Sequence, residues 1–211
     1  MSVLDTIIEN RIIAIARGFG PEELIPASKA LYDGGVRVFE VAFEHGKDLV
    51  RTADAIGRLA ESLPSDCAVG AGTVLSPEEV RLAGSHGASF IISPNTDKEV
   101  IAETKRLGLI SIPGAMTPSE IVAAHSYGAD IVKVFPAGML GIEYFKAIRA
   151  PLSHIPMAAV AGVTLDNISA FRSAGAVAFG ISSSIYNAEA VRSGDYEKLR
   201  ALAEAFVSKV K

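Results

Sequence analysis

The stretch Tyr127-Gly128-Ala129-Asp130-Ile131-Val132-Lys133-Val134-Phe135-Pro136-Ala137 contains the unit that decides the fold, together with one residue that does not suit it. Glycine after a helical segment favours the left-handed conformation that ends a helix. The β-branched and aromatic residues that follow predict a buried strand, in which a lysine is out of place. The same helix, glycine and strand order recurs along the chain, so this stretch predicts one unit of a repeated fold.

Eight short apolar runs share this pattern: Ile12–Ala16, Val38–Ala42, Ala68–Ala71, Phe90–Ile92, Leu109–Ile112, Ile131–Phe135, Met157–Val160 and Val177–Phe179. Segments with helical spacing lie between them, among them Glu22–Tyr32, Asp48–Leu63, Glu78–His86 and Ser119–Tyr127. Eight such units in 211 residues take about 26 residues each, which suits a (β/α)8 TIM barrel. Val3–Glu9 predicts a short helix before the first strand, and the absence of a linker predicts a single domain over 1–211.

A doubly wound open sheet is the runner-up fold. No Gly-x-Gly-x-x-Gly motif follows the first strand, which weighs against the dinucleotide-binding version of that fold.

Composition narrows the functional classes. Hydrophobic residues make up 49% of the chain and charged residues 21%, as in a globular protein. The net charge of -4, without a basic block, disfavours nucleic-acid and acidic-membrane binding. The single cysteine, Cys67, excludes an internal disulfide, and no apolar run approaches the ~20 residues of a membrane span. Since the N-terminus also lacks a signal peptide, we expect a cytoplasmic protein.

Strand alternation predicts that Lys133 points into the barrel and that Glu40 lies near it. If Val132 and Val134 pack on the helices, Lys133 points to the barrel axis, and Glu40 does the same in its own strand. Burial lowers the pKa of a lysine and leaves a neutral, nucleophilic amine. Two structural alternatives stay open: a lysine whose head reaches solvent, and a buried ion pair that fills the axis.

Other strand ends supply candidate binding groups, because chemistry in this fold lies at the carboxyl ends of the strands. Arg17 follows the first strand and could bind a carboxylate or phosphate, or be a solvated surface charge. Thr73 offers a hydroxyl after a glycine-rich strand. Pro94 and the sequence Ile112-Pro113-Gly114 predict tight turns at the mouth that could wall a pocket.

Taken in order, these motifs resemble the 2-keto-3-deoxy-6-phosphogluconate (KDPG) aldolases, a family that includes 4-hydroxy-2-oxoglutarate (KHG) aldolases and a 6-phosphogalactonate (KDPGal) branch. The resemblance runs from about Ile12 to Tyr196 and rests on Arg37–Val41, Gly70–Leu75, Ile92–Asn95, Ile112–Gly114 and Lys133–Ala137. It implies a class I aldolase on a (β/α)8 barrel that cleaves a 2-keto-3-deoxy sugar acid to pyruvate and an aldehyde. It further implies a homotrimer that uses no metal or other cofactor.

The resemblance also assigns roles to single residues. Lys133 matches the Schiff-base lysine, Glu40 the general acid and base, and Thr73 a group near the pyruvyl carboxylate. The better-known branch has an arginine where this chain has Glu44, whereas the galactonate branch has one at the end of the first strand. Arg17 is therefore the candidate carboxylate clamp, and Pro94 also resembles the galactonate branch.

The phosphate end departs from the family pattern. Substrate-binding candidates here are Gly162, Val163, Gly180, Ser182 and Ser183. Ala161 and Ser182 each stand where the family typically has a glycine. A change from glycine to alanine or serine keeps the backbone N–H donor, but the added side chain hinders close approach of the substrate. An unphosphorylated substrate is therefore also possible. The structural alternative for Ser182–Ser184 is to cap the N-terminus of the last helix.

Three competing functions fit parts of the sequence. A metal-dependent aldolase needs clustered ligands, and the four histidines, His45, His86, His125 and His154, are dispersed along the chain. A sugar-phosphate isomerase or epimerase could use Glu40 as its base, with Lys133 acting only through its charge. A non-catalytic barrel that binds a sugar acid is the third class. The residues do not name the aldehyde product or its C4 configuration.

Overall fold

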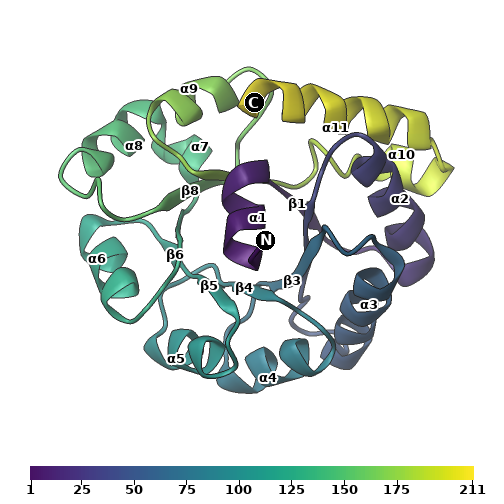
Figure 1. Ribbon diagram of the computed structural model, residues 1–211, viewed down its shortest axis with the longest axis horizontal. Helices are drawn as coiled ribbons and strands as arrows, with labels where there is room; N and C mark the ends of the chain where they lie inside the picture. The colour runs from purple at the N-terminus through teal and green to yellow at the C-terminus, as the bar shows by residue number, and fades with distance from the viewer.

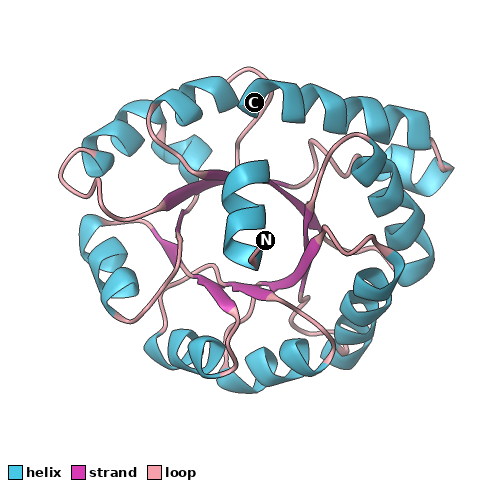
Figure 2. Cartoon of the chain, viewed as in Figure 1, coloured by secondary structure: helices cyan, strands magenta, loops and turns pink.

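A ring of parallel strands, surrounded by helices, organises the chain (Figures 1 and 2). The structure, a computed structural model, describes residues 1–211. The strands are β1 (Ile12–Ala16), β2 (Val38–Ala42), β3 (Ala68–Gly72), β4 (Phe90–Ile92), β5 (Ile110–Ile112), β6 (Gly114–Ala115), β7 (Val132–Val134), β8 (Met157–Val160) and β9 (Ala178–Ile181). Their order is β5-β4-β3-β2-β1-β9-β8-β7-β6, and every pair is parallel. The predicted (β/α)8 barrel is confirmed, and the open sheet is wrong.

Helices alternate with these strands and, apart from α1, form the outer layer (Figure 2). They are α1 (Val3–Asn10), α2 (Pro21–Asp33), α3 (Leu49–Ser62), α4 (Pro77–Ser85), α5 (Lys98–Arg106), α6 (Pro118–Ser126), α7 (Ala137–Leu140), α8 (Ile142–Arg149), α9 (Ile168–Ser173), α10 (Ala188–Ser193) and α11 (Tyr196–Val210). The five helices that were predicted by range differ from these by at most one residue at each end. No helix is long and apolar enough to cross a membrane.

The fifth predicted strand differs from its prediction and closes the ring. The sequence Ile112-Pro113-Gly114 was expected to turn at the mouth, but the chain continues through Pro113 into β6. β5 pairs with β4 on one side, and β6 pairs with β7 on the other. The Pro113 carbonyl accepts a hydrogen bond of 2.9 Å from Lys133 N, so the proline interrupts the ladder without ending it. The nine strands are thus eight runs, one of them broken by a residue that has no N–H.

Strand alternation separates two hydrophobic layers. Outward residues such as Phe39 and Val132 pack with the helices in the larger core cluster. The inner cluster fills the ring below the mouth with branched side chains, including Ile13, Val38 and Ile131. α1 lies across the near opening of the ring in Figure 1, and its Ile7 is fully buried in the inner cluster. The lower end of the barrel is therefore packed, and the carboxyl ends of the strands form the open end.

Candidate active site

Lys133 and Glu40 meet inside the ring near the open end. Lys133 is central in β7 and Glu40 in β2, and their side chains share the inward face with Ile131 and Val38 respectively. Only 7% of Lys133 and 2% of Glu40 is exposed. Both line one cavity of about 300 Å³. The strand register leaves room for the Lys133 side chain, because its neighbours on the adjacent strands, Gly114 and Ala158, are small residues.

Burial shifts both groups toward their neutral forms. The pKa of Lys133 is lowered first by burial, an effect that Glu40 opposes and the Arg17 charge reinforces. The pKa of Glu40 is raised by burial, while Lys133 and Arg17 act in the opposite direction. Glu40 Oε2 is buried without a hydrogen-bond partner, and Lys133 Nζ lies 4.6 Å from the centre of the Phe135 ring. An unpartnered carboxylate oxygen beside a desolvated amine is an arrangement suited to proton transfer.

Gly72 provides the space that Glu40 occupies. A Cβ atom at this position would lie 1.7 Å from Glu40 Oε1. Gly72→Ala is therefore expected to push the carboxylate out of place and lower kcat by about 100-fold or more, since misplacement of a catalytic group by ~1 Å has such an effect. Steady-state kinetics measure this loss. Gly84→Ala is the matched control, because its Cβ would meet only ordinary contacts of 3.4 Å; similar losses in both variants would contradict the explanation.

Arg17 and Thr73 come together from strands β1 and β3. Arg17 Nη2 donates a hydrogen bond of 3.2 Å to Thr73 Oγ1, across 56 residues of sequence. Arg17 lines the same cavity as Lys133, whereas Thr73 does not line it. Thr73 has φ 58°, the left-handed region, which is unusual for a β-branched residue. Strained backbone of this kind gathers at functional sites.

The turns after β8 and β9 form the far side of the cavity. Gly162, Val163, Gly180, Ser182 and Ser183 all line it. The first turn rests on the segment that follows Lys133: Gly138 N donates to the Ala161 carbonyl at 2.8 Å, and a Cβ on Gly162 would lie 2.8 Å from Gly138 Cα. Ala161 has φ 68°, which explains why a glycine suits that position.

The serine turn does not cap a helix, so that structural alternative is wrong. Asn187 caps α10 through a bond from Ala190 N, and Asp195 caps α11 through a bond from Lys198 N. The hydroxyl groups of Ser182, Ser183 and Ser184 make no hydrogen bond within the protein, and they line the cavity. The serine turn therefore presents free donors and acceptors to whatever occupies the cavity.

Two predicted site residues, Thr73 and Pro94, do not line the cavity, and some residues that line it were not predicted. Pro94 does not line the cavity; its carbonyl packs against Gly114, where a Cβ would lie 2.2 Å away. Phe135 and Thr164 line the cavity but were not predicted. Phe135 shares the inward face with Lys133, so strand alternation could have identified it. No sequence signal singles out Thr164 within its turn.

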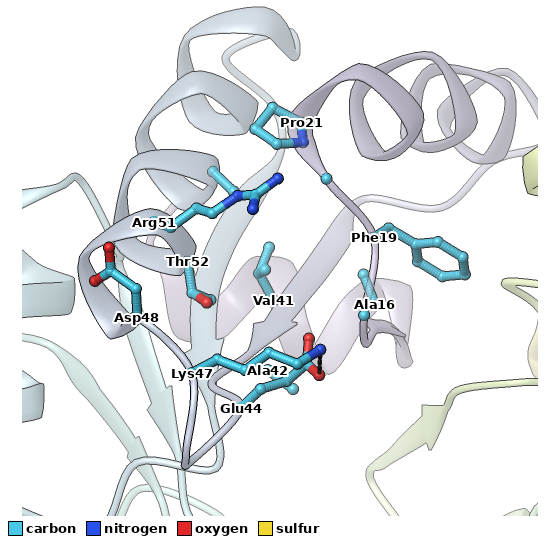
Figure 3. Close-up of a pocket in the computed structure, with 13 residues that line it drawn as sticks. Ala16, Phe19, Pro21, Val41, Ala42, Glu44, Lys47, Asp48, Arg51 and Thr52 are labelled. Carbon is cyan, nitrogen blue, oxygen red and sulfur yellow. Dashed lines mark hydrogen bonds and ion pairs between the residues drawn. The ribbon is translucent and has the colours of Figure 1, made fainter.

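A second cavity, of about 330 Å³, lies outside the strand ring between α2 and α3 (Figure 3). None of the predicted site residues lines it. Figure 3 shows Glu44 joined to Lys47, an ion pair of 2.6 Å, beside Arg51 and Thr52. Glu44, which replaces the arginine of the better-known branch, thus lines the outer cavity and pairs with a neighbouring lysine instead of facing Lys133. We therefore place the chemistry in the cavity around Lys133.

The histidines are as dispersed in space as in sequence, apart from one edge-to-face pair. The ring centroids of His125 and His154 lie 5.8 Å apart. No group of three or more His, Cys, Asp or Glu side chains is arranged to hold a metal ion.

Comparisons with known proteins agree with the geometry. The family model described as KDPG and KHG aldolase matches residues 3–202. A probable 2-dehydro-3-deoxy-6-phosphogalactonate aldolase of Rhizobium meliloti (strain 1021) is 35% identical over 197 residues, covering 93% of this chain and 90% of that protein. A 2-dehydro-3-deoxy-phosphogluconate aldolase of Dickeya dadantii (strain 3937) is 33% identical over 191 residues, covering 89% and 86%.

Among solved structures, one described as native KDPGal superposes with a TM-score of 0.82 at 32% identity, covering 94% of this chain and 93% of that chain. Identities of 35% and 33% to the galactonate and gluconate proteins are too close to separate the two branches. The family itself is clear from matches that span nearly the whole chain. The protein belongs to the KDPG and KHG aldolase family and is an aldolase, a carbon–carbon lyase that releases pyruvate.

Proposed function

We propose that this aldolase works through a Schiff base on Lys133, with Glu40 as its general acid and base. The observation that carries the proposal is the pairing of a buried amine and a buried, unpartnered carboxylate in one cavity at the open end of the barrel. An amine whose pKa is lowered by burial is neutral over a wider pH range than an exposed lysine, and the neutral amine is the nucleophile. A carboxyl whose pKa is raised is suited to give and take protons there.

The chemistry follows from these two groups. Lys133 attacks the keto carbon of the substrate, and loss of water gives an iminium. Glu40 takes the proton of the C4 hydroxyl, the C3–C4 bond breaks, and its electron pair forms an enamine as the aldehyde leaves. Glu40 then returns the proton to C3, and hydrolysis frees pyruvate and the amine. The iminium is the electron sink, so these steps use no metal, and activity is expected to survive dialysis against a chelator.

Arg17 is the proposed clamp for the substrate carboxylate. It is one of only two cations in the cavity lining, the other being Lys133. A guanidinium can bind a carboxylate with two parallel hydrogen bonds, which orients the keto carbon toward the amine. Thr73 supports the clamp through its bond to Arg17 Nη2.

The substrate class proposed is a 2-keto-3-deoxy-6-phospho sugar acid of the KDPG or KDPGal type. The turns 161–164 and 182–184 offer N–H groups and free hydroxyls at the far side of the cavity. One observation speaks against a phosphorylated substrate: no lysine or arginine lies in either turn. A phosphate would be held by neutral donors alone, so 4-hydroxy-2-oxoglutarate or another unphosphorylated acid is the second candidate.

Trapping tests the Schiff base directly. Borohydride added with pyruvate is expected to reduce the iminium and leave a pyruvyl adduct on Lys133, located by mass spectrometry of peptides. An adduct on another lysine, or none, would exclude the proposed chemistry.

Ser182→Asp separates the two substrate candidates. A new carboxylate in the serine turn should repel a phosphate and raise KM for phosphorylated substrates by about tenfold, since like charges at close range cost about 1 kcal/mol or more. KM for unphosphorylated 2-keto-3-deoxy acids should change little. A retro-aldol panel over both kinds of acid, in both C4 configurations, measures this; equal effects on both kinds would show that the turn does not bind phosphate.

We also propose a homotrimer in the cytoplasm, on the strength of the family resemblance and, for the compartment, of the single free cysteine. Mass photometry or light scattering of the purified protein tests the assembly.

A further inference from the structure

His45 contacts Thr73, the residue that binds the proposed carboxylate clamp, and it does not line the cavity. It belongs to the connection between β2 and α3 and projects toward the turn that follows β3. Its Nε2 lies 2.9 Å from the Thr73 carbonyl oxygen. A carbonyl oxygen only accepts hydrogen bonds, so Nε2 carries the hydrogen and His45 is the donor.

The turn that His45 contacts is held from several sides. Glu79 on α4 accepts a hydrogen bond of 2.6 Å from Leu75 N, and its other oxygen lies 3.7 Å from His45 Nδ1. Ser93, after β4, donates to the Val74 carbonyl at 2.7 Å. Backbone polar groups of three successive residues are thus bound by side chains from three other segments.

These contacts fix a conformation that the turn would not adopt by itself. Thr73 has φ 58°, and a β-branched residue in the left-handed region persists only where its surroundings hold it. The left-handed backbone sets the direction of the Thr73 side chain, whose Oγ1 accepts from Arg17 Nη2 at 3.2 Å. Arg17 is an exposed residue at the rim, and the bond to Thr73 is the one hydrogen bond that its side chain makes within the protein. Its orientation therefore depends on Thr73, and the orientation of Thr73 depends on the bonds to its turn.

We infer that His45 is a positioning residue: it holds the Thr73 carbonyl and thereby fixes the Arg17 guanidinium for the substrate carboxylate. The inference deepens the proposed function, since it rests on Arg17 as the clamp. His45 touches neither Lys133 nor Glu40, so it acts on substrate binding and leaves the bond-breaking step alone.

The test compares His45→Ala with His45→Gln. The alanine variant is expected to raise both KM in retro-aldol cleavage and the pyruvate concentration that half-saturates borohydride trapping, each by about tenfold, the worth of one lost hydrogen bond. kcat should stay within about threefold. Glutamine places an amide N–H donor at a similar reach, so His45→Gln should restore most of the affinity.

His86→Ala is the matched control, because His86 also contacts a backbone carbonyl, Leu82 O at 2.8 Å, and a carboxylate, Asp54 at 3.2 Å, outside the site. It should leave KM unchanged. Glu79→Gln is a milder second variant that keeps the turn's shape while removing the carboxylate charge beside His45, and it should raise KM by a smaller factor. In an Arg17→Ala background, His45→Ala should add no further rise, since the group it positions is gone.

The possible results distinguish an error about His45 from an error about Arg17 or about the Schiff base. If Arg17→Ala raises the half-saturating pyruvate concentration and His45→Ala does not, the inference about His45 is wrong and the clamp stands. If Arg17→Ala itself changes nothing, both assignments fall. If wild-type protein forms no pyruvyl adduct, the Schiff-base proposal falls first. A loss of kcat and affinity that glutamine does not rescue would mean that His45 serves only the fold.

Discussion

Lys133→Ala is expected to abolish aldol cleavage, with a loss of at least about 10⁴-fold in kcat, because no other residue of the cavity lining carries an amine. The barrel should still fold. Removing a buried amine takes away the cost of its desolvation, which offsets the lost packing of the lysine stem. Steady-state kinetics measure the first effect, and circular dichroism with thermal unfolding measures the second.

Lys47→Ala is the control for this variant, because Lys47 lies at the same end of the barrel, is largely exposed and does not line the Lys133 cavity. Its kcat should stay within about threefold of wild type. Substantial cleavage by Lys133→Ala would disprove the Schiff-base assignment. The pH dependence adds a check: burial lowers the pKa of Lys133, so trapping should rise with pH and level off below the range of an exposed lysine.

Glu40→Gln is expected to slow proton transfer far more than imine formation. Exchange of the C3 hydrogens of pyruvate with deuterated water should fall by roughly 10²–10⁴-fold, the usual contribution of a general acid or base. Borohydride trapping should persist. Glu40 opposes the lowering of the Lys133 pKa, so its removal leaves the amine no less neutral than before.

The variant should also fold well, since glutamine has nearly the same volume and the carboxylate it replaces has an unpartnered buried oxygen. Proton exchange followed by NMR and trapping followed by mass spectrometry give the two rates. Glu44→Gln, in the outer cavity, is the control and should alter neither. An equal loss of both rates in Glu40→Gln would assign Glu40 a structural role.

Strand alternation predicted the most consequential part of the site. Lys133 and Glu40 lie 93 positions apart in sequence, yet each follows the inward face of an apolar run, and a closed ring brings inward faces together. Periodicity also located the helices, because an apolar stripe and a terminal glycine are local properties of the chain. What depends on side-chain direction within a regular element can be predicted from the sequence.

The turns were less predictable because their geometry depends on distant partners. Pro113 has no N–H, and a residue without this donor usually ends a strand. Here the Pro113 carbonyl accepts a hydrogen bond from Lys133 of β7, and the strand continues. The serines after β9 resemble a helix cap, but the helix begins later and Asn187 caps it. The bond from Arg17 to Thr73 exists only once β1 and β3 lie on either side of β2 in the ring.

The packed lower end of the barrel has a kinetic consequence. Because α1 and the inner cluster close that end, both products must leave by the one open mouth. In the proposed mechanism the pyruvyl half is still bound to Lys133 when the aldehyde forms, so the aldehyde departs first and pyruvate last. Such an ordered release makes pyruvate the product that competes with substrate for free enzyme, while the aldehyde competes only by reversing the cleavage on the loaded lysine.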